Sequence, residues 1–176
     1  FDALNEFAPD DAVFVGDAGS AYYVGYQAIN IRDKQRMLFS VAQGDMGWAL
    51  PAAIGVAKAG AKNVICIVGD GSFMSNMQEM AVIKEHNLPI KIVLLNNYGY
   101  LSIKNTQSKF YEGRVYGSTT KSGLSFPSFT RLADAFGFNY EIFTNVNHLD
   151  KEMYTALHKQ HPAIINCVCT QNQQIL

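Results

Sequence analysis

The stretch from Val64 to Asn97 constrains the fold more than any other part of this chain. It contains two short apolar runs, Val64–Val68 and Ile90–Leu95, which are separated by a segment of helical pattern and a break at Asn87-Leu88-Pro89. Short runs rich in Ile and Val on either side of a helix are typical of buried parallel strands. The stretch therefore predicts a β-α-β unit within an α/β domain.

Each of the two apolar runs ends in a polar cluster, Gly69-Asp70-Gly71-Ser72 after the first and Asn96-Asn97 after the second. The carboxyl ends of parallel strands lie at one edge of a sheet, and ligands bind there. We therefore expect Asp70 and Asn97 to point oxygen atoms at one hard cation, such as Mg²⁺. The alternative is a turn and a helix cap in an ordinary doubly wound domain.

The first polar cluster also suits a diphosphate group beside such a cation. Gly69 and Gly71 have no Cβ atom, so phosphate oxygens can approach the backbone closely. The N–H groups of Gly71 and Ser72 are expected in the first turn of the following helix, where they complement negative charge. The two clusters together predict a site for a diphosphate and magnesium.

The rest of the chain continues the alternation of strands and helices. Further strands are expected at Ala12–Gly16, Met37–Val41, Asn139–Phe143 and Ala163–Cys169. Phe1–Phe7 is expected to be the end of a helix. Further helices are expected over Tyr22–Ala28, Trp48–Ala59, the segment between the two apolar runs, the residues from Asn97 to about Gln107, Phe129–Phe136 and His148–Lys159. This order predicts a doubly wound α/β fold with six mostly or wholly parallel strands and helices on both faces.

Length and composition limit the classes of protein to consider. The 176 residues have the size of a single domain, and the formal net charge of -1 gives no reason to expect nucleic acid or a membrane as partner. No apolar run approaches the roughly 20 residues that span a bilayer, and no signal peptide is recognised at the start. The three cysteines lie in apolar runs and are interpreted as free thiols in a reducing cytoplasm. A start at Phe1 rather than Met is interpreted as part of a longer, multidomain chain.

The two polar clusters and their flanking segments resemble the thiamine diphosphate motif of transketolase- and decarboxylase-type enzymes. From Val41 to Gln107 the chain is most similar to the acetohydroxyacid (acetolactate) synthases. The resemblance covers essentially the whole chain, 1–176, as their C-terminal, diphosphate-binding domain. It implies the thiamine diphosphate-binding fold, with thiamine diphosphate and Mg²⁺ as cofactors. The implied activity is decarboxylation of a 2-keto acid and transfer of the acyl anion equivalent to an acceptor.

The same resemblance implies which residues hold the cofactor. Gly44-Asp45-Met46-Gly47 is similar to the family's Gly-Thr-Met-Gly, so the Gly44 carbonyl and the Met46 N–H are expected at the aminopyrimidine, with the Met46 side chain wedging the cofactor into its bent form. A core-filling role is the alternative for Met46. The implied metal ligands are Asp70, Asn97 and the main-chain carbonyl of Gly99. The complete set of expected cofactor-binding residues is Gly19, Ser20, Gly44, Met46, Gly69, Asp70, Gly71, Ser72, Asn97, Gly99 and Tyr100.

Past the metal cluster, the chain departs from both subgroups of the family. Thr106 stands where the synthases have a tryptophan that is linked to choice of the second keto acid. Asn97-Tyr98-Gly99-Tyr100 is similar to the Asn-x-Gly-Tyr of 2-keto acid decarboxylases, but Ile103 stands where those enzymes carry a glutamate. The long segment Ser108–Pro127 is predicted either as a lid over an anionic substrate or as a solvated connection or oligomer contact.

No stretch of the chain resembles the pyrimidine-binding domain that carries the family's activating glutamate. The resemblance therefore implies that the chain contains no catalytic residue of its own and is incomplete without that domain. This pyrimidine-binding domain is expected to come from a second subunit, in a homodimer or tetramer. The resemblance is also compatible with FAD bound elsewhere in the full chain. A natural subunit of a split enzyme, such as sulfopyruvate decarboxylase, is the alternative to a part of a longer chain.

Two alternatives for the function stay open. One is a 2-keto acid, sulfopyruvate or phosphonopyruvate decarboxylase, or a C–C hydrolase, that uses the same cofactor. The other is a non-enzymatic receiver-like or nucleotide-binding module. Against the latter, the chain lacks the Gly-Lys-Ser/Thr of a P-loop and a G-x-G-x-x-G fingerprint.

Overall fold

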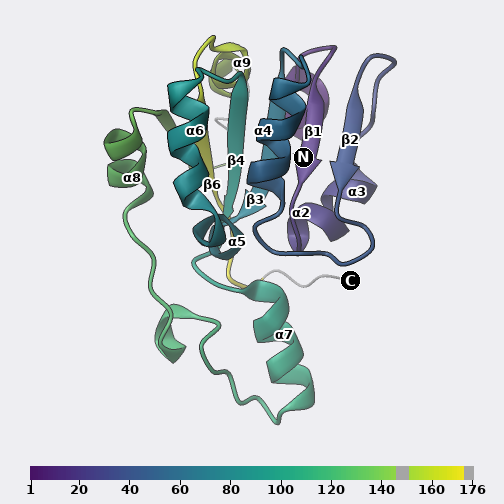
Figure 1. Cartoon of the computed structure of the whole chain (residues 1–176). Coiled ribbons are helices and arrows are strands. Elements are labelled where there is room, and N and C mark those ends of the chain that lie inside the picture. Colours follow the sequence, from purple (N-terminus) through teal and green to yellow (C-terminus); the bar gives the residue numbers. More distant parts are fainter. Residues whose placement is uncertain (146–150, 173–176) are drawn as a thin grey trace.

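A six-stranded parallel sheet forms the centre of the computed structural model, which describes residues 1–145 and 151–172 (Figure 1). The strands are β1 (Val13–Gly16), β2 (Arg36–Phe39), β3 (Val64–Gly69), β4 (Ile90–Asn96), β5 (Asn139–Phe143) and β6 (Ala163–Val168). Their order in the sheet is β2-β1-β3-β4-β6-β5, and every neighbouring pair is parallel. The predicted parallel α/β sheet of six strands is confirmed.

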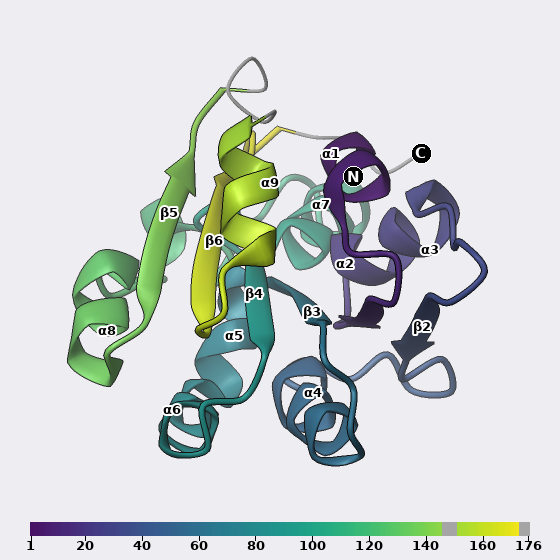
Figure 2. The ribbon, with the colours of Figure 1, turned by 90° about the horizontal axis from the view of Figure 1, so that it is seen from above.

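Helices cover both faces of this sheet, as Figure 2 shows from above. They are α1 (Asp2–Phe7), α2 (Ser20–Tyr23), α3 (Gly25–Ala28), α4 (Ala49–Lys58), α5 (Asp70–Ser75), α6 (Met80–Glu85), α7 (Leu101–Phe110), α8 (Phe129–Phe136) and α9 (Lys151–His158), with short 3₁₀ turns at Met77–Glu79 and Thr120–Ser122. Buried residues of α4, α5, α6 and α8 pack on one face, and those of α1, α2 and α9 on the other. Within the described ranges, no helix is long and apolar enough to cross a membrane.

The central strands are buried on both sides, which explains their continuous apolar runs. In β3, Cys66 and Val68 belong to the core on the α4 face, whereas Ile65 and Ile67 belong to the core on the α1 face. All four side chains are at most 1% exposed. A strand with no solvent-facing side needs no alternation of polar and apolar residues, as expected for a parallel sheet.

Two of the predicted helices are interrupted in the structure. The helix expected over Tyr22–Ala28 begins earlier, at Ser20, and divides into α2 and α3 at Val24. The helix expected after Ser72 ends at Ser75, because Asn76 leaves the helical region with φ -139° and ψ 27°, and α6 resumes after a 3₁₀ turn.

Other element boundaries differ from the predictions by a few residues. Strand β2 ends at Phe39 rather than Val41, and α7 continues to Phe110 rather than ending near Gln107. The predicted helix His148–Lys159 is observed as α9 from Lys151, and 148–150 lie outside the described residues.

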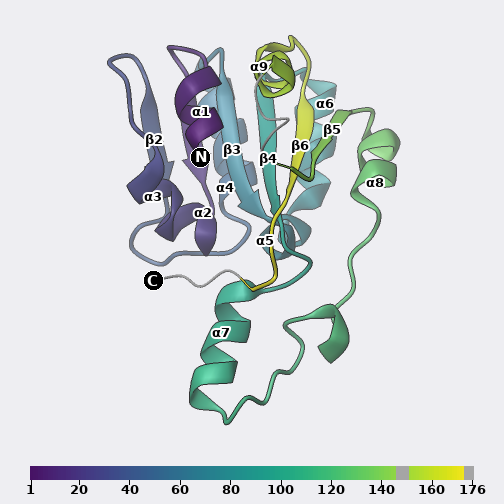
Figure 3. The same cartoon turned by 180° about the vertical axis from the view of Figure 1, so that it is seen from behind.

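Helix α7 extends away from the layered body, beyond the carboxyl ends of the strands (Figures 1 and 3). Figure 3 shows α1 and α9 on the face of the sheet opposite to α4 and α6. The chain returns from α7 through an irregular segment to α8, which packs at the β5 side of the sheet.

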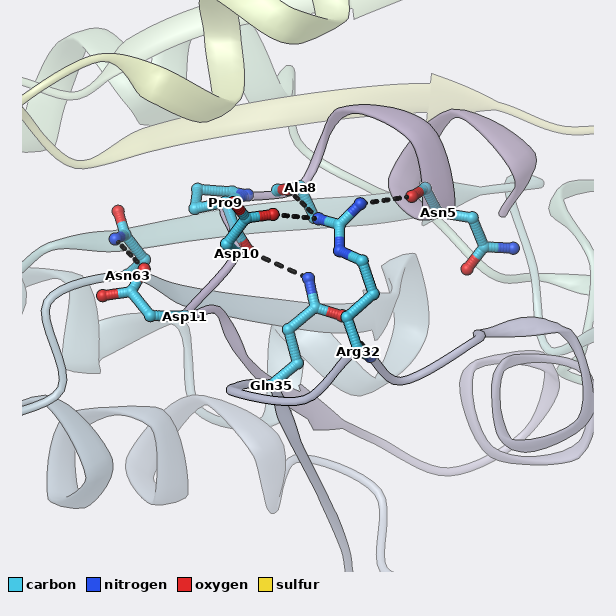
Figure 4. Close-up of polar contacts among 8 residues, drawn as sticks. All are labelled: Asn5, Ala8, Pro9, Asp10, Asp11, Arg32, Gln35 and Asn63. Atoms are coloured by element: carbon cyan, nitrogen blue, oxygen red, sulfur yellow. Dashed lines mark hydrogen bonds and ion pairs between the residues drawn. The ribbon is translucent and has the colours of Figure 1, made fainter.

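A polar cluster joins the end of α1 to the connection before β2, at the amino ends of the strands (Figure 4). The Arg32 guanidinium donates hydrogen bonds to the carbonyls of Asn5 (3.0 Å) and Ala8. The Gln35 side chain donates to the carbonyl of Pro9 at 2.8 Å. A cation at the last carbonyls of a helix satisfies acceptors that have no partner within the helix, so this cluster fixes α1 against the rest of the domain.

Candidate functional site

A cavity of about 220 Å³ lies where the loops after β1, β2, β3 and β4 meet. Its lining includes every residue that the sequence predicted for cofactor binding, namely Gly19, Ser20, Gly44, Met46, Gly69, Asp70, Gly71, Ser72, Asn97, Gly99 and Tyr100. These residues come from four separate loops. The parallel sheet brings them together because all its strands end at the same edge.

Asp70 links the loop after β3 to the loop after β4. It is the first residue of α5 and is 1% exposed. Its Oδ1 accepts a hydrogen bond from the N–H of Gly71 (2.7 Å), and its Oδ2 accepts one from the N–H of Gly99 (3.1 Å). Asn97 lines the same cavity. The side chain of Asp70 and the two other predicted metal ligands therefore lie at one site.

Burial raises the pKa of the Asp70 carboxyl from 3.8 to about 6, although the surrounding main-chain N–H groups, that of Gly71 foremost, oppose this shift. Among the described residues that line the cavity, none is Lys, Arg or His. The site therefore has one buried carboxylate and no cationic side chain to neutralise it. A carboxylate, an amide oxygen and a main-chain carbonyl are oxygen donors that Mg²⁺ prefers, so the donor set fits this cation.

Gly69 and Gly71 serve different purposes in the turn after β3. A Cβ atom at Gly69 would meet no atom within 4 Å, so the backbone there is open to the cavity. A Cβ atom at Gly71 would lie 2.1 Å from the Tyr100 ring, which packs directly on the glycine. The N–H of Gly71, expected to be free for phosphate, instead donates to the carboxylate of Asp70. The reason is that the aspartate begins the helix and its side chain folds back on the next peptide.

Met46 lies at the wall of the cavity with 42% of its surface exposed, so it does not fill the core. Gly44, two residues before it, has φ +65°, a left-handed conformation that favours glycine. The N–H of Gly44 donates to the carbonyl of Ser40 at 2.7 Å, and this bond closes the turn after β2.

Sequence reasoning missed the buried carboxylate of Asp17. It follows β1 directly, is 2% exposed, and accepts hydrogen bonds from the main-chain N–H groups of Gly47 (3.0 Å) and Ala49 (2.9 Å). In the turn after β1, only Gly19 and Ser20 were predicted to bind the cofactor. No local sequence pattern predicts these hydrogen bonds, because the partners of Asp17 lie some thirty residues further along the chain.

A second cavity of about 560 Å³ lies beside α7 and adjoins the first. Ser102 and Ile103 line both cavities. The remaining lining residues of the second cavity are Thr106, Gln107, Tyr111, Arg114 and Tyr116. Thr106, where the synthases have a tryptophan, thus lies in a space that opens toward the predicted cofactor site.

The segment Ser108–Pro127, predicted as a lid, a solvated connection or an oligomer contact, is attached at its middle to the cavity loop. The Tyr100 N–H donates to the carbonyl of Ser118 at 2.9 Å, and Gly99 forms an antiparallel bridge with Thr119. The Gln107 side chain donates to the carbonyl of Tyr116 at 2.9 Å, and its carbonyl oxygen accepts from the Ser118 hydroxyl at 2.7 Å. These contacts make the middle of the segment a wall next to Gly99.

The fold and the site place the chain in a known class of protein. It belongs to the family described as "Thiamine pyrophosphate enzyme, C-terminal TPP binding domain", which it matches over residues 17–167. The suspected resemblance is thereby confirmed.

Among curated proteins, the chain is similar to the acetolactate synthase large subunits. It is 35% identical over 164 residues to that of Porphyra purpurea, covering 93% of this chain and 27% of the relative. It is 34% identical over 164 residues to the isozyme 2 large subunit of Escherichia coli, covering 93% of this chain and 29% of the relative. It is 30% identical over 174 residues to the Lactococcus lactis large subunit, covering 98% of this chain and 30% of the relative. The chain thus spans less than a third of the length of these relatives.

A solved structure shares the fold. The thiamine diphosphate-dependent 4-hydroxybenzoylformate decarboxylase of Rhodococcus jostii RHA1 superposes with a TM-score of 0.82. The superposition covers 96% of this chain and 31% of that enzyme, at 22% identity.

Proposed function

We propose that this chain binds the diphosphate and Mg²⁺ of thiamine diphosphate, as the diphosphate-binding domain of an acetolactate synthase-like enzyme. That enzyme would decarboxylate a 2-keto acid and transfer the resulting acyl anion equivalent to an acceptor. The chain, 1–176, would be one domain of a longer multidomain protein or a subunit of a split one. Its family membership and its similarity to acetolactate synthase large subunits support this proposal.

The observation that carries the proposal is the charge of the cavity lining. Asp70 is buried there, and none of the described lining residues is a lysine, arginine or histidine. A diphosphate entering this cavity alone would meet a carboxylate and no opposite charge, which is unfavourable in a site of low dielectric. A divalent cation held by Asp70, Asn97 and the Gly99 carbonyl would reverse this balance and attract the diphosphate.

The residues of this chain would bind and orient the cofactor. Gly69 leaves the backbone open toward the diphosphate, while Ser72, Gly19 and Ser20 line the same space. Gly44 and Met46 would support the aminopyrimidine and so would orient the bound cofactor for reaction. When bound, thiamine diphosphate supplies the carbon nucleophile that attacks the keto acid and the electron sink for its decarboxylation.

Activation of the cofactor would need a carboxyl group besides Asp70, and none lies among the described residues that line the cavity. Asp70 is the only acidic residue among the described residues that line the cavity, and it is assigned to the cation. We therefore expect the activating glutamate on a pyrimidine-binding domain, supplied by a second subunit in a dimer or tetramer. The isolated chain would bind cofactor without turning over substrate.

Isothermal titration calorimetry with thiamine diphosphate, in the presence and absence of Mg²⁺, tests this proposal. We expect binding only when Mg²⁺ is present, and its loss in Asp70→Ala, because the cation then lacks its carboxylate ligand. Asp11→Ala is the matched control, since Asp11 bonds to Asn63 at the far end of the strands. Binding that is equal with and without Mg²⁺, or unchanged in Asp70→Ala, would contradict the proposal.

A decarboxylase or C–C hydrolase that uses the same cofactor is the second candidate. The cavity beside Thr106 favours it, because the side chain that selects the second keto acid in the synthases is replaced there by a small one. Product analysis with the complete enzyme separates the candidates, since a synthase joins two keto acids and the others do not. Family membership argues against the non-enzymatic alternative.

A further inference from the structure

We propose that Asp17 and Asn76 are positioning residues that hold Gly47 through its N–H and its carbonyl and so fix Met46 against the cofactor. This inference rests on the proposed function, in which Met46 supports the aminopyrimidine. It assigns a purpose to two side chains that do not line the cofactor cavity themselves.

Asp17 and Asn76 each form one hydrogen bond to Gly47. The Gly47 N–H donates to Oδ1 of Asp17 at 3.0 Å, and the Gly47 carbonyl accepts from Nδ2 of Asn76 at 2.7 Å. Asp17 follows β1, and Asn76 follows α5. Two elements far apart in the sequence therefore hold the same residue of the loop after β2.

Steric contacts make this arrangement specific to glycine. Gly47 has φ +84°, and a Cβ atom there would lie 2.8 Å from the Cβ of Ser75 and 3.1 Å from Nδ2 of Asn76. The residue is thus held in a left-handed conformation between two elements, with no room for a side chain. The position of the peptide that joins Met46 to Gly47 follows from this conformation.

The second carboxylate oxygen of Asp17 accepts a hydrogen bond from the start of α4. Its Oδ2 accepts from the N–H of Ala49, the first residue of that helix, at 2.9 Å. A negative charge near a helix N-terminus is favourable, and Trp48 at the N-cap forms no side-chain cap of its own. One buried carboxylate therefore fixes the loop and the start of α4 together.

Within the described residues, Met46 forms no hydrogen bond of its own. Its side chain is 42% exposed, so core packing does not hold it. On the other side, Gly44 and Asp45 are exposed residues whose bonds run to Ser40 within the same loop. The direction of the Met46 side chain therefore depends on the conformation of Gly47, and hence on Asp17 and Asn76.

This dependence predicts different effects on the binding of thiamine diphosphate and on the binding of inorganic pyrophosphate. Asp17 makes no bond to Asp70, Asn97 or Gly99 among the described contacts, so its hydrogen bonds do not involve the predicted cation ligands. Loss of the hydrogen bonds to Gly47 should weaken binding of thiamine diphosphate, which has a ring system that contacts Met46. It should leave binding of inorganic pyrophosphate, which has none, unaffected.

The test measures the affinity of the chain for thiamine diphosphate and for inorganic pyrophosphate, each with Mg²⁺, in Asp17→Asn and Asn76→Ala. We expect thiamine diphosphate affinity to fall about tenfold in each variant, the size typical of one lost hydrogen bond to a charged or buried group. Pyrophosphate affinity should change less than about twofold. Hydrogen exchange at the Gly47 and Ala49 amides should accelerate in Asp17→Asn. Asp11→Asn is the matched control for the charge change.

Asn76→Ala keeps the test decisive if Asp17→Asn fails to fold, which circular dichroism detects. Equal losses for the two ligands, or no loss for either in a folded variant, would overturn the inference. Failure of the unsubstituted chain to bind thiamine diphosphate would overturn the proposed function, and this inference with it. That outcome is distinct because it is seen before any substitution is made.

Discussion

At the residue scale, the two glycines of the turn after β3 are needed for two different physical reasons. The sequence suggested that both glycines of Gly69-Asp70-Gly71-Ser72 admit phosphate oxygens. In the structure only Gly69 faces open space, whereas Gly71 makes room for the Tyr100 ring. The Asp70 carboxylate occupies the N–H of Gly71. A motif can therefore be recognised correctly while the reason for one of its residues is different.

The two glycines should respond differently to the same substitution. Gly71→Ala should lower the free energy of unfolding by about 1–3 kcal/mol, because its new methyl group overlaps the Tyr100 ring in a packed site. Gly69→Ala should change it by less than about 0.5 kcal/mol, since the space is open and its φ of -74° suits any residue. Urea unfolding monitored by circular dichroism measures both.

A double variant identifies the cause of the Gly71→Ala effect. Tyr100→Ala removes the ring that the new methyl group meets, so combining the two should cost less than the sum of their separate effects. Strict additivity, or equal losses for Gly69→Ala and Gly71→Ala, would contradict the steric explanation.

At the element scale, β4 is a strand buried on both faces that nevertheless contains a lysine. Lys91 is 5% exposed, and burial lowers its pKa from 10.5 to about 8. Below pH 8 the folded chain keeps a poorly solvated charge that the unfolded chain exposes to water. Between about 8 and 10.5 the unfolded state binds more protons than the folded state, so stability rises with pH in that window.

Lys91→Met should therefore raise the free energy of unfolding at pH 7 by about 1–3 kcal/mol. This advantage should shrink as the pH rises from 8 toward 10, where the native lysine has lost its proton. Chemical denaturation at pH 7 and at pH 9.5 measures the difference. Lys58→Met, at an exposed position of α4, is the control and should give no pH-dependent gain. An advantage that grew with pH would contradict the assigned cause.

The segment after α7 illustrates a different limit of element prediction. Its length suggested a lid, a solvated connection or an oligomer contact. Main-chain bonds to Gly99 and Tyr100 and the side chain of Gln107 attach its middle to the cavity loop, which none of these predictions included. These contacts join residues with no periodic pattern, so no propensity argument predicts them.

At the scale of the whole molecule, the Arg32 cluster and the candidate cofactor site lie at opposite ends of the sheet. The Arg32 cluster lies at the amino ends of the strands (Figure 4), and the predicted cofactor residues lie at the carboxyl ends. Substitutions at one end should therefore leave the other end's property unchanged.

Arg32→Ala tests this separation. It leaves the carbonyls of Asn5 and Ala8 without their donor and should lower the free energy of unfolding by about 1–3 kcal/mol. Affinity for thiamine diphosphate with Mg²⁺ should stay within about twofold of the unsubstituted chain when measured well below the melting temperature. Thermal unfolding and calorimetry give the two quantities.

The matched control for Arg32→Ala is Asp10→Asn. Asp10 is 90% exposed in its ion pair with Arg32, so its loss should cost little. Arg32→Lys should restore only part of the stability, because an ammonium group lacks the planar fork that reaches two carbonyls. A large loss of cofactor affinity in Arg32→Ala would show that the two ends are coupled.

The class of fold and most residues that line the candidate site could be predicted from the amino-acid sequence alone. Buried parallel strands require continuous apolar runs, and the polar clusters that follow them must meet at one edge of the sheet. Asp70 and Asn97 could therefore be paired from their positions alone, and the family resemblance supplied Gly44 and Met46.

The folded structure was needed to establish the strand order, the packing of Tyr100 on Gly71, and the hydrogen bonds of Asp17 and Asn76 to Gly47. Each of these depends on contacts between segments that are distant in the chain. Such contacts leave no periodic trace in the sequence, because a single buried carboxylate or amide can accept or donate wherever folding delivers a partner.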